Sequence, residues 1–361
     1  MTIEKFDSGT PWPKAPVPWI RLWDARVAWK DVEPERDVWD FSRLDAYVAA
    51  AQQHQTKILY TFGTTPQWAS SEPSQPGNYG PGTAAVPANI RDWQNFVAAI
   101  ASRYLGKIAA YEILNEPNLS GYFTGGVEDQ LRLISSAYQT IKSIDPHAIV
   151  LSPGYQGPGF KELDQLLSMG ASQYFDAIAY HFYQFPAYPE NQLQLISTVT
   201  AVLKKYSLNL PIWDTEIGFG PGQTFASDDQ QAAYFARTIL IHWIAGVQHV
   251  FWYAWDDHEW VRLWLTEPDL VTLTKAGVAY GVLEKWITGS TLNSCSDNNG
   301  LHICSLALAS GSQGHLIWLT AGTEGFTVPA DWSASGISAL DGTSRQVGTT
   351  IQLGAEPVLV Q

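Results

Sequence analysis

The chain has 361 residues, of which 45% are hydrophobic and 16% charged, and its formal net charge is −14. This length accommodates one (β/α)₈ barrel of about 250 residues and a small further domain, and the composition is that of a globular protein. The negative charge argues against nucleic acid as a partner, because phosphate binding needs a basic surface; a neutral polysaccharide is compatible with it. The chain contains sixteen Trp and sixteen Tyr, and most of them are explained as core residues. Those that the core does not need are suited to stacking on sugar rings.

Apolar runs alternate with amphipathic segments up to about residue 288, which is typical of parallel strands joined by crossover helices. Helices are expected over 41–54, over 90–104 with Asn89 as the N-cap, and from Ser227 to a stop at Gly246. A weak first strand and seven clear ones make eight, the number of a closed barrel. The expected strands are Thr2–Phe6, Trp19–Trp23, Lys57–Phe62, Ala109–Leu114, Ala148–Ser152, Ala177–Tyr183, Pro211–Glu216 and Val247–Tyr253.

Two other parts of the chain depart from this alternation. Gly and Pro cluster in the long segment 63–88, and long loops after barrel strands are usually functional. After residue 288 helical periodicity stops, and short β-type runs appear between Gly, Ser, Asn and Asp residues. We therefore expect an α/β protein with a (β/α)₈ TIM barrel over 1–288 and a small β-sandwich-like accessory domain over 289–361.

The two cysteines, Cys295 and Cys304, lie on either side of a hairpin-turn signal at Asn298-Asn299-Gly300. A cross-strand disulfide and two free thiols both fit this spacing, and a disulfide would imply an oxidising compartment. No stretch is long and apolar enough to span a membrane, and no signal peptide opens the sequence. We expect a secreted or periplasmic protein whose signal peptide is absent from this chain, with a cytoplasmic protein as the alternative.

Two glutamates, 100 residues apart, each end an apolar run: Glu116 and Glu216. Burying a carboxylate at the end of an apolar strand is costly unless the carboxylate is paired with a cation or takes part in function. Counted along the chain, Glu116 follows the fourth strand and Glu216 ends the seventh, and the carboxyl ends of barrel strands carry catalytic groups. Two carboxylates that face each other across the barrel mouth can flank a glycosidic bond. This predicts a glycosidase, and a separation of about 5–5.5 Å would make it a retaining one.

The neighbours of the two glutamates favour different roles for them. Asn115 can hold a sugar hydroxyl next to the reacting carbon, which favours Glu116 as acid/base and Glu216 as nucleophile. Arg21 and either Tyr183 or His181 are the candidates for keeping Glu216 ionised.

The remaining candidates are aromatic. Because strand side chains alternate, Tyr253 and Trp255 are favoured for the pocket and Trp252 for the core. A structural ion pair is the alternative for Glu116 and Glu216, and a plain surface or salt-bridge residue is the alternative for Arg21. Core packing is the alternative for Trp68, His181 and Tyr183. The predicted substrate-binding residues are Arg21, Trp68, Asn115, His181, Tyr183, Tyr253 and Trp255.

Several stretches resemble the clan of (β/α)₈ retaining glycosidases that carry the acid/base after strand four and the nucleophile on strand seven. Within that clan the chain looks most like glycoside hydrolase family 39, over roughly residues 15–290, and the β-type tail resembles that family's accessory sandwich. The stretches are Arg21-Leu-Trp-Asp24, Trp39-Asp-Phe41, Thr65-Pro-Gln-Trp68, Tyr111-Glu-Ile-Leu-Asn-Glu-Pro-Asn118, Tyr180-His-Phe-Tyr183 and Trp213-Asp-Thr-Glu-Ile-Gly218.

The resemblance implies cleavage of β-type bonds in a poly- or oligosaccharide by double displacement. That family contains β-xylosidases, iduronidases and endo-acting enzymes, and the compact chain with Trp-bearing loops looks more like the endo-acting members. An exo-acting β-xylosidase and a catalytically silent carbohydrate-binding barrel are the alternatives.

Other chemistries have little support in the sequence. The eight histidines are scattered without a His-Glu-x-x-His motif, and phosphate-loop, Gly-x-Gly-x-x-Gly and Gly-x-Ser-x-Gly motifs are absent. We therefore expect neither a metal nor a cofactor. The stretch Asp256-Asp257-His258-Glu259 is interpreted as a solvated loop, with a distal sugar subsite or a cation site as alternatives. The oligomeric state is not predicted.

Overall fold

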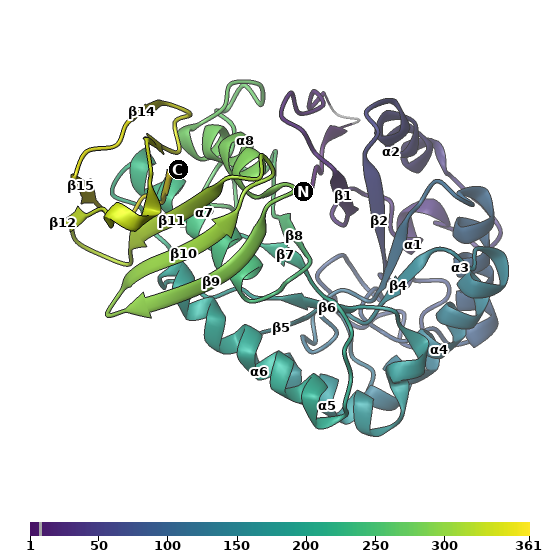
Figure 1. The fold of residues 1–361 in the computed structure, drawn as a ribbon. Helices are drawn as coiled ribbons and strands as arrows, with labels where there is room; N and C mark the ends of the chain where they lie inside the picture. The colour runs from purple at the N-terminus through teal and green to yellow at the C-terminus, as the bar shows by residue number, and fades with distance from the viewer. Residues whose placement is uncertain (7–8) are drawn as a thin grey trace.

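The computed structural model describes residues 1–6 and 9–361. Two four-stranded parallel sheets, with the orders β1-β2-β3-β4 and β5-β6-β7-β8, form the wall of a barrel that is surrounded by helices (Figure 1). The strands are β1 (Trp19–Leu22), β2 (Lys57–Phe62), β3 (Ala110–Ile113), β4 (Ile149–Leu151), β5 (Tyr155–Gln156), β6 (Ile178–His181), β7 (Ile212–Ile217) and β8 (His249–Trp252).

Every barrel strand except β4, which β5 follows directly, is followed by helical segments. The α-helices are α1 (Trp29–Val32), α2 (Ser42–Gln53), α3 (Ile90–Arg103), α4 (Val127–Ile144), α5 (Phe160–Ser168), α6 (Gln192–Lys205), α7 (Asp228–Ile244) and α8 (Lys275–Ile287). Short 3₁₀ turns are η2 (Gly157–Gly159), η3 (Ala171–Tyr174), η4 (Pro189–Asn191) and, in the C-terminal part, η5 (Ala330–Trp332). None of the helices in the described ranges has the length and hydropathy needed to cross a membrane.

The predicted helix ends are confirmed. Asn89 Oδ1 accepts from the Arg91 N–H at 3.0 Å at the start of α3, and Ser227 Oγ accepts from Gln230 N–H at 3.2 Å at the start of α7. Gly246, just past α7, has a φ of +78°, a left-handed conformation that glycine adopts without strain.

The two sheets are joined by single bridges. Leu151 at the end of β4 bridges Ala177, which lies just before β6. On the opposite side, Thr2 bridges Arg21 of β1, and its N–H donates to the carbonyl of Trp252 in β8 at 2.9 Å. With Thr2 counted as the first strand position, and with β4 and β5 counted as one position because both neighbour β6, eight positions close the barrel, as the sequence predicted.

The expected first strand Thr2–Phe6 is therefore reduced to one bridge. In this segment the N–H groups of Glu4 and Lys5 donate to the Asp256 carboxylate at 2.8 Å each instead of extending a ladder. Asp256 is buried, as is Asp257 beside it, so the interpretation of this segment as a solvated loop is wrong for both residues. The sequence pattern hid this because the partners of Asp256 lie about 250 residues away.

The barrel interior is arranged in layers. Its lower part is filled by a cluster of apolar residues that is separate from the larger core under the helices: Leu59, Ala110, Leu151, Ala177, Ala179, Trp213 and Phe251. Strand side chains alternate, so the residue two positions further along lies on the same face. Those next positions are Thr61, Glu112, His181 and Thr215, and Arg21 follows Trp19 in the same way. A polar layer therefore lies directly above the apolar one.

The C-terminal part is antiparallel. A six-stranded sheet has the order β14-β13-β16-β11-β10-β9, and β12 pairs with β15. A small core of Ile317, Leu319, Ile337, Ile351, Leu353 and Val360 belongs to it. The strands are β9 (Thr291–Asn298), β10 (Leu301–Ala307), β11 (Gln313–Leu319), β12 (Glu324–Thr327), β13 (Gly336–Ser338), β14 (Ser344–Gln346), β15 (Thr350–Leu353) and β16 (Val358–Val360).

Cys295 and Cys304 are directly opposite each other in the β9–β10 pair, with Cα atoms 4.1 Å apart, and they form a disulfide. Of the two alternatives that the sequence left open, the structure has the disulfide.

This C-terminal sheet lies beside α7 and α8 in Figure 1. Trp318 of β11 donates from its indole N–H to Glu190 Oε1 at 3.1 Å, and Glu190 is also bonded to Arg237 of α7. The division of the chain at residue 288, between α8 and β9, into two separate domains stays a prediction.

Candidate active site

Glu116 reaches the barrel mouth through an unusual backbone. Strand β3 ends at Ile113, and Leu114 and Glu116 then have φ values of +77° and +42°. Non-glycine residues in the left-handed region are strained and are held there only by their surroundings. The Glu116 N–H donates to the carbonyl of Gly154 at 2.8 Å, which ties this turn to the segment after β4.

Glu216 is turned toward the same place by an irregularity in β7. Trp213 and Thr215 face the barrel interior, so simple alternation would direct Glu216 toward the helices, as it directs Asp214 toward His242 of α7. The register between β7 and β8 shifts between Asp214 and Ile217. Such a bulge redirects side chains, and bulges are common beside active sites.

The two strand ends therefore bring both carboxylates together. One oxygen of Glu116, one of Glu216 and one ring nitrogen of His181 all lie within 4.8 Å of one another. All three residues are buried, the two glutamates having about 6% and 8% of their surface exposed. Because so little of their surface is exposed, only a small part of these two closely spaced carboxylates is accessible to solvent or to a substrate.

Glu216 is held by two donors. Arg21 Nη1 donates to its Oε2 at 2.6 Å, and the Tyr183 hydroxyl donates to its Oε1 at 2.9 Å. Burial is the largest influence on Glu216 and leaves its pKa raised, although His181 and Arg21 act to lower it. Arg21 and Tyr183 are thus the partners of Glu216 that the sequence predicted.

Glu116 is bonded to His181 instead, through Nδ1 and Oε1 at 2.8 Å. Burial alone would lower the pKa of His181, but Glu216, Glu112 and Glu116 outweigh it and raise the pKa to about 10. His181 is therefore protonated at neutral pH and donates to Glu116. Of the two partners that the sequence left open for Glu216, the structure assigns Tyr183 to Glu216 and His181 to Glu116.

Glu112, which the sequence reasoning missed, lies beneath both glutamates. It accepts from Arg21 Nε at 2.8 Å, from the Thr61 hydroxyl at 2.6 Å and from the Thr215 hydroxyl at 2.5 Å. Burial would raise the pKa of Glu112, but Arg21 and His181 outweigh it and lower the pKa to about 2. The signal was present in the sequence: a charged residue inside an apolar strand, on the same face as Ala110.

Replacing Glu112 by Gln should lower the free energy of unfolding by about 3–5 kcal/mol at pH 7, because Arg21 loses a buried ionic partner. Urea denaturation measures this. The folded pKa of about 2 lies below the ordinary glutamate value of 4.5, so the contribution is present above pH 4.5 and is lost as the pH falls toward 2. The difference between the two proteins should shrink over that interval.

Asp164→Asn is the matched control, because it removes the exposed ion pair with Lys205 (2.7 Å) and should change stability by less than about 1 kcal/mol. A Glu112→Gln protein as stable as the control variant would contradict the structural role of Glu112.

A second missed residue, Asp24, lies just after β1. Its carboxylate accepts from the Tyr253 hydroxyl at 2.8 Å and from the Tyr79 hydroxyl, and burial raises its pKa. Nearby, Glu4 Oε1 is buried without a hydrogen-bond partner among residues 1–6 and 9–361, and burial together with Asp24 raises the pKa of Glu4 to about 8. Tyr253, a predicted substrate-binding residue, thus joins the Asp24 carboxylate to the site.

Two of the predicted aromatic ligands have packing partners of their own. The Trp68 indole donates to the Glu33 carbonyl at 2.9 Å, Arg36 lies over its ring at 4.5 Å, and Trp29 of α1 meets it edge-on. Trp68 is therefore half-buried and packs against α1 and the turn after it. Its predicted contact with a substrate stays a prediction.

Trp255 is only about 1% exposed, and its backbone N–H donates to the Thr2 carbonyl at 2.9 Å. Its ring belongs to the main core and is not available to a sugar. Trp252 is also buried, as the sequence predicted.

Asn115 and Arg21 bond each other, with 2.6 Å between Nη2 and Oδ1. Arg21 is completely buried, so in this structure it supports Glu216 and Asn115 and presents no surface to a substrate. The expectation that Arg21 itself binds substrate is therefore corrected to a positioning role.

Glu116, His181 and Glu216 are also spaced so that each offers one atom to a metal ion. His181 is bonded to Glu116 and is protonated at neutral pH, as its raised pKa requires, so it would have to lose that proton to bind a metal. The group fits proton transfer better than metal binding. The absence of metal and cofactor stays a prediction.

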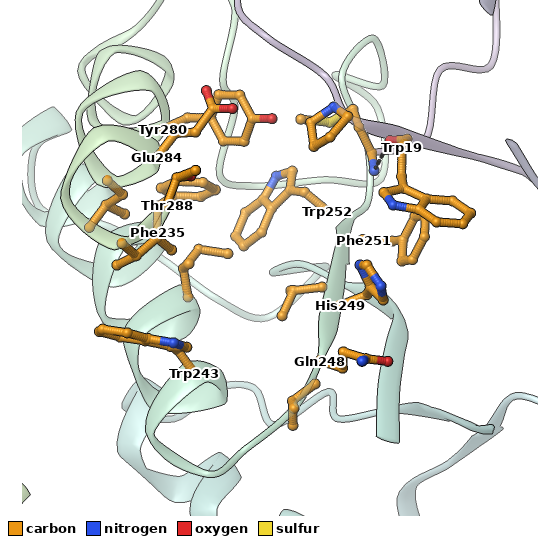
Figure 2. A pocket seen from close by; sticks show the side chains of 17 residues that line it. Trp19, Phe235, Trp243, Gln248, His249, Phe251, Trp252, Tyr280, Glu284 and Thr288 are labelled. Atoms are coloured by element: carbon orange, nitrogen blue, oxygen red, sulfur yellow. Dashed lines mark hydrogen bonds between the residues drawn. The ribbon is translucent and has the colours of Figure 1, made fainter. Parts of the chain in front are cut away.

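A cavity of about 320 Å³ lies away from these residues, between β8, α7 and α8 (Figure 2). Figure 2 shows Phe235, Trp243 and Trp252 pointing into it. Among the described residues that line it, Glu284 is the only carboxylate, whereas glycoside hydrolysis needs two. We therefore place the candidate site at the barrel mouth.

An eight-position barrel with paired carboxylates at the carboxyl ends of two strands is the arrangement expected of a barrel enzyme. Residues 38–280, more than half of the 361, match the family described as glycosyl hydrolase catalytic core, and the chain belongs to that family. It is therefore a glycoside hydrolase, and its substrate is a carbohydrate.

Solved structures with this fold span nearly the whole chain. A family 39 glycoside hydrolase from Bacteroides cellulosilyticus WH2 is 23% identical, with a TM-score of 0.77 over 95% of this chain and 75% of that one. A monomeric β-xylosidase from Caulobacter crescentus CB15 is 14% identical, with a TM-score of 0.67 over 95% and 89%. A family 30 endoxylanase from Clostridium papyrosolvens C71 is 14% identical, with a TM-score of 0.61 over 95% and 88%.

These similarities confirm the predicted fold class. They also confirm the resemblance to clan A barrels and to glycoside hydrolase family 39 at the level of the fold.

Proposed function

We propose that the chain is a retaining glycoside hydrolase in which Glu216 is the nucleophile and Glu116 the acid/base. The observation that carries this proposal is the approach of their carboxylate oxygens to within 4.8 Å. Retaining enzymes have carboxyl groups about 5–5.5 Å apart, whereas inverting enzymes need about 6.5–9.5 Å to admit a water molecule.

The partners of the two residues support the assignment of roles. Glu216 is bonded to Arg21, whose guanidinium does not release a proton at any working pH, so Glu216 is favoured as the ionised residue. Glu116 is bonded to His181, which does carry a transferable proton. The His181–Glu116 pair can therefore hold the proton that the leaving group needs.

The proposed reaction proceeds in two displacements. Glu216 attacks the anomeric carbon while Glu116 donates a proton to the glycosidic oxygen, so the C–O bond breaks and a glycosyl ester forms. Glu116, now ionised, removes a proton from a water molecule that attacks the same carbon and releases Glu216. The sugar leaves with its original anomeric configuration.

For the substrate we propose a β-linked polysaccharide or oligosaccharide attacked internally. The relatives of known activity include a β-xylosidase and an endoxylanase, which makes xylan and xylo-oligosaccharides the first substrates to test. The Cys295–Cys304 disulfide supports a secreted or periplasmic location. An exo-acting β-xylosidase is the second candidate, favoured by the similarity to the Caulobacter enzyme.

The test is release of reducing ends from xylan, glucans, mannans and bacterial exopolysaccharides, with products sized by mass spectrometry. Oligosaccharides from one polymer, with the β-anomer formed first in the proton NMR spectrum, are the expected result. Monosaccharide as the sole product would replace the endo-acting proposal by the exo-acting one, and initial α-anomer would contradict retention. Calorimetric binding of a polymer without any product would instead indicate a silent carbohydrate-binding barrel.

A further inference from the structure

Trp260 stands out among the aromatic residues by its exposure. The described part of the chain holds all sixteen tryptophans, and Trp260 is the only one among its exposed large hydrophobic residues, with 38% of its surface open. It lies in the loop after β8, directly after Glu259. An exposed tryptophan needs an explanation when its neighbours belong to a catalytic site.

The neighbours of Trp260 do belong to the site. Its ring centroid is 5.9 Å from that of Tyr183, which donates to Glu216, and 5.8 Å from that of Tyr253, which donates to Asp24. Phe185 is the third ring in contact, at 5.9 Å. All three contacts are edge-to-face, with interplanar angles of 76° to 83°. Trp260 is thus one aromatic ring away from the proposed nucleophile.

The position of Trp260 is fixed from several sides. A Cβ atom on Gly220 would lie 2.5 Å from Trp260 Cζ2, so the indole occupies space that only a glycine leaves. Asp257 Oδ1 accepts from the N–H groups of Glu259 and Trp260 at 2.6 and 3.1 Å. The Arg262 N–H donates to the Phe219 carbonyl at 2.7 Å, which joins this loop to the loop after β7. A ring held this firmly loses little conformational freedom when it binds a ligand.

From these observations we infer that Trp260 is a stacking platform for a sugar unit adjacent to the one that reacts. The apolar face of a pyranose stacks on a flat indole, and a rigid, partly exposed tryptophan next to the nucleophile offers such a surface. The inference rests on the proposed function and deepens it: the substrate must extend beyond the reacting sugar, so the enzyme acts on oligosaccharides or polymers of at least two units.

Trp260→Ala tests this with two substrates of the same sugar, an oligosaccharide and a glycosyl fluoride, which has no second sugar or ring to stack. On the oligosaccharide kcat/KM should fall roughly tenfold, mainly through KM, because a stacking contact of this kind is lost. On the glycosyl fluoride it should change less than about twofold. Trp260→Phe keeps a flat face and should recover part of the loss.

Val271→Ala is the matched control, since Val271 lies in the same long connection between β8 and α8, is 39% exposed, and is outside the site. It should behave as the wild type on both substrates. If Trp260→Ala lowered kcat/KM equally on the two substrates, Trp260 would have a structural role and the platform would be overturned. Unchanged kcat/KM on both substrates would also overturn it.

Failure of the hydrolase proposal is distinguishable from failure of the platform. If the wild type hydrolyses no glycan, retardation in native gels that contain xylan, glucan or mannan replaces turnover as the measurement. Wild type and Val271→Ala retarded more than Trp260→Ala would support the platform. Equal mobility of all three proteins in every gel would overturn it.

Discussion

Replacing Glu216 by Ala should lower kcat on any glycoside substrate by about 10⁴-fold or more, since no glycosyl ester can form without the nucleophile. The fold should survive, because Glu216 lies at the mouth and Arg21 keeps its bonds to Glu112 and Asn115. Steady-state kinetics and urea denaturation measure the two effects. The truncated side chain also leaves room for a small anion next to the anomeric carbon.

That room gives the sharper test. With azide and an activated aryl β-glycoside, Glu216→Ala should regain turnover and form the α-glycosyl azide, because azide attacks from the side that the nucleophile vacated. Glu267→Ala, at an exposed glutamate in the loop before α8, is the control and should keep wild-type activity. Near-normal activity of Glu216→Ala without azide would remove Glu216 from the mechanism.

The predicted parts of this site are those that strand ends and alternation determine. Glu116 and Glu216 each follow an apolar run, and parallel strands place such ends at one rim of a barrel. Tyr183 and His181 were found in the same way, as residues at the end of the sixth strand. Local pattern was sufficient for them, since period and position along a strand are properties of a short segment.

Other features depend on contacts that no short segment contains. The bulge that turns Glu216 inward is a register shift between β7 and β8, and the left-handed φ of Glu116 is held by a bond to Gly154. Trp255 has the same residue type as a sugar-binding tryptophan, and only its packing partners assign it to the core.

The layered interior explains why the polar residues occur together. Glu112 and Arg21 form a buried pair, and one removed partner would leave an uncompensated charge, so the pair is stable only as a unit. Arg21 then supports Glu216, and His181 lies between Glu112, at 3.7 Å from Nε2, and Glu116. Both proposed catalytic carboxylates are thus held from below by a single network.

Replacing Glu116 by Gln should affect substrates according to their leaving group. For a glycan, whose alcohol leaving group needs a proton, kcat/KM should fall about 10²- to 10⁴-fold, the usual contribution of a general acid. For a dinitrophenyl glycoside, which needs little protonation, the first displacement should be nearly unchanged. Hydrolysis of the glycosyl ester should still be slow, because the same residue is the general base for water. Stopped-flow measurement should therefore show a burst of dinitrophenol followed by slow turnover.

Azide separates the two glutamates by stereochemistry. In Glu116→Gln the glycosyl ester on Glu216 still forms, and azide needs no base, so it should speed the slow phase and yield the β-glycosyl azide. Opposite anomers from the two variants follow from opposite roles on the two faces of the sugar. Equal losses on glycan and dinitrophenyl substrates, or the same azide anomer from both variants, would contradict the assignment of Glu116 as the acid/base.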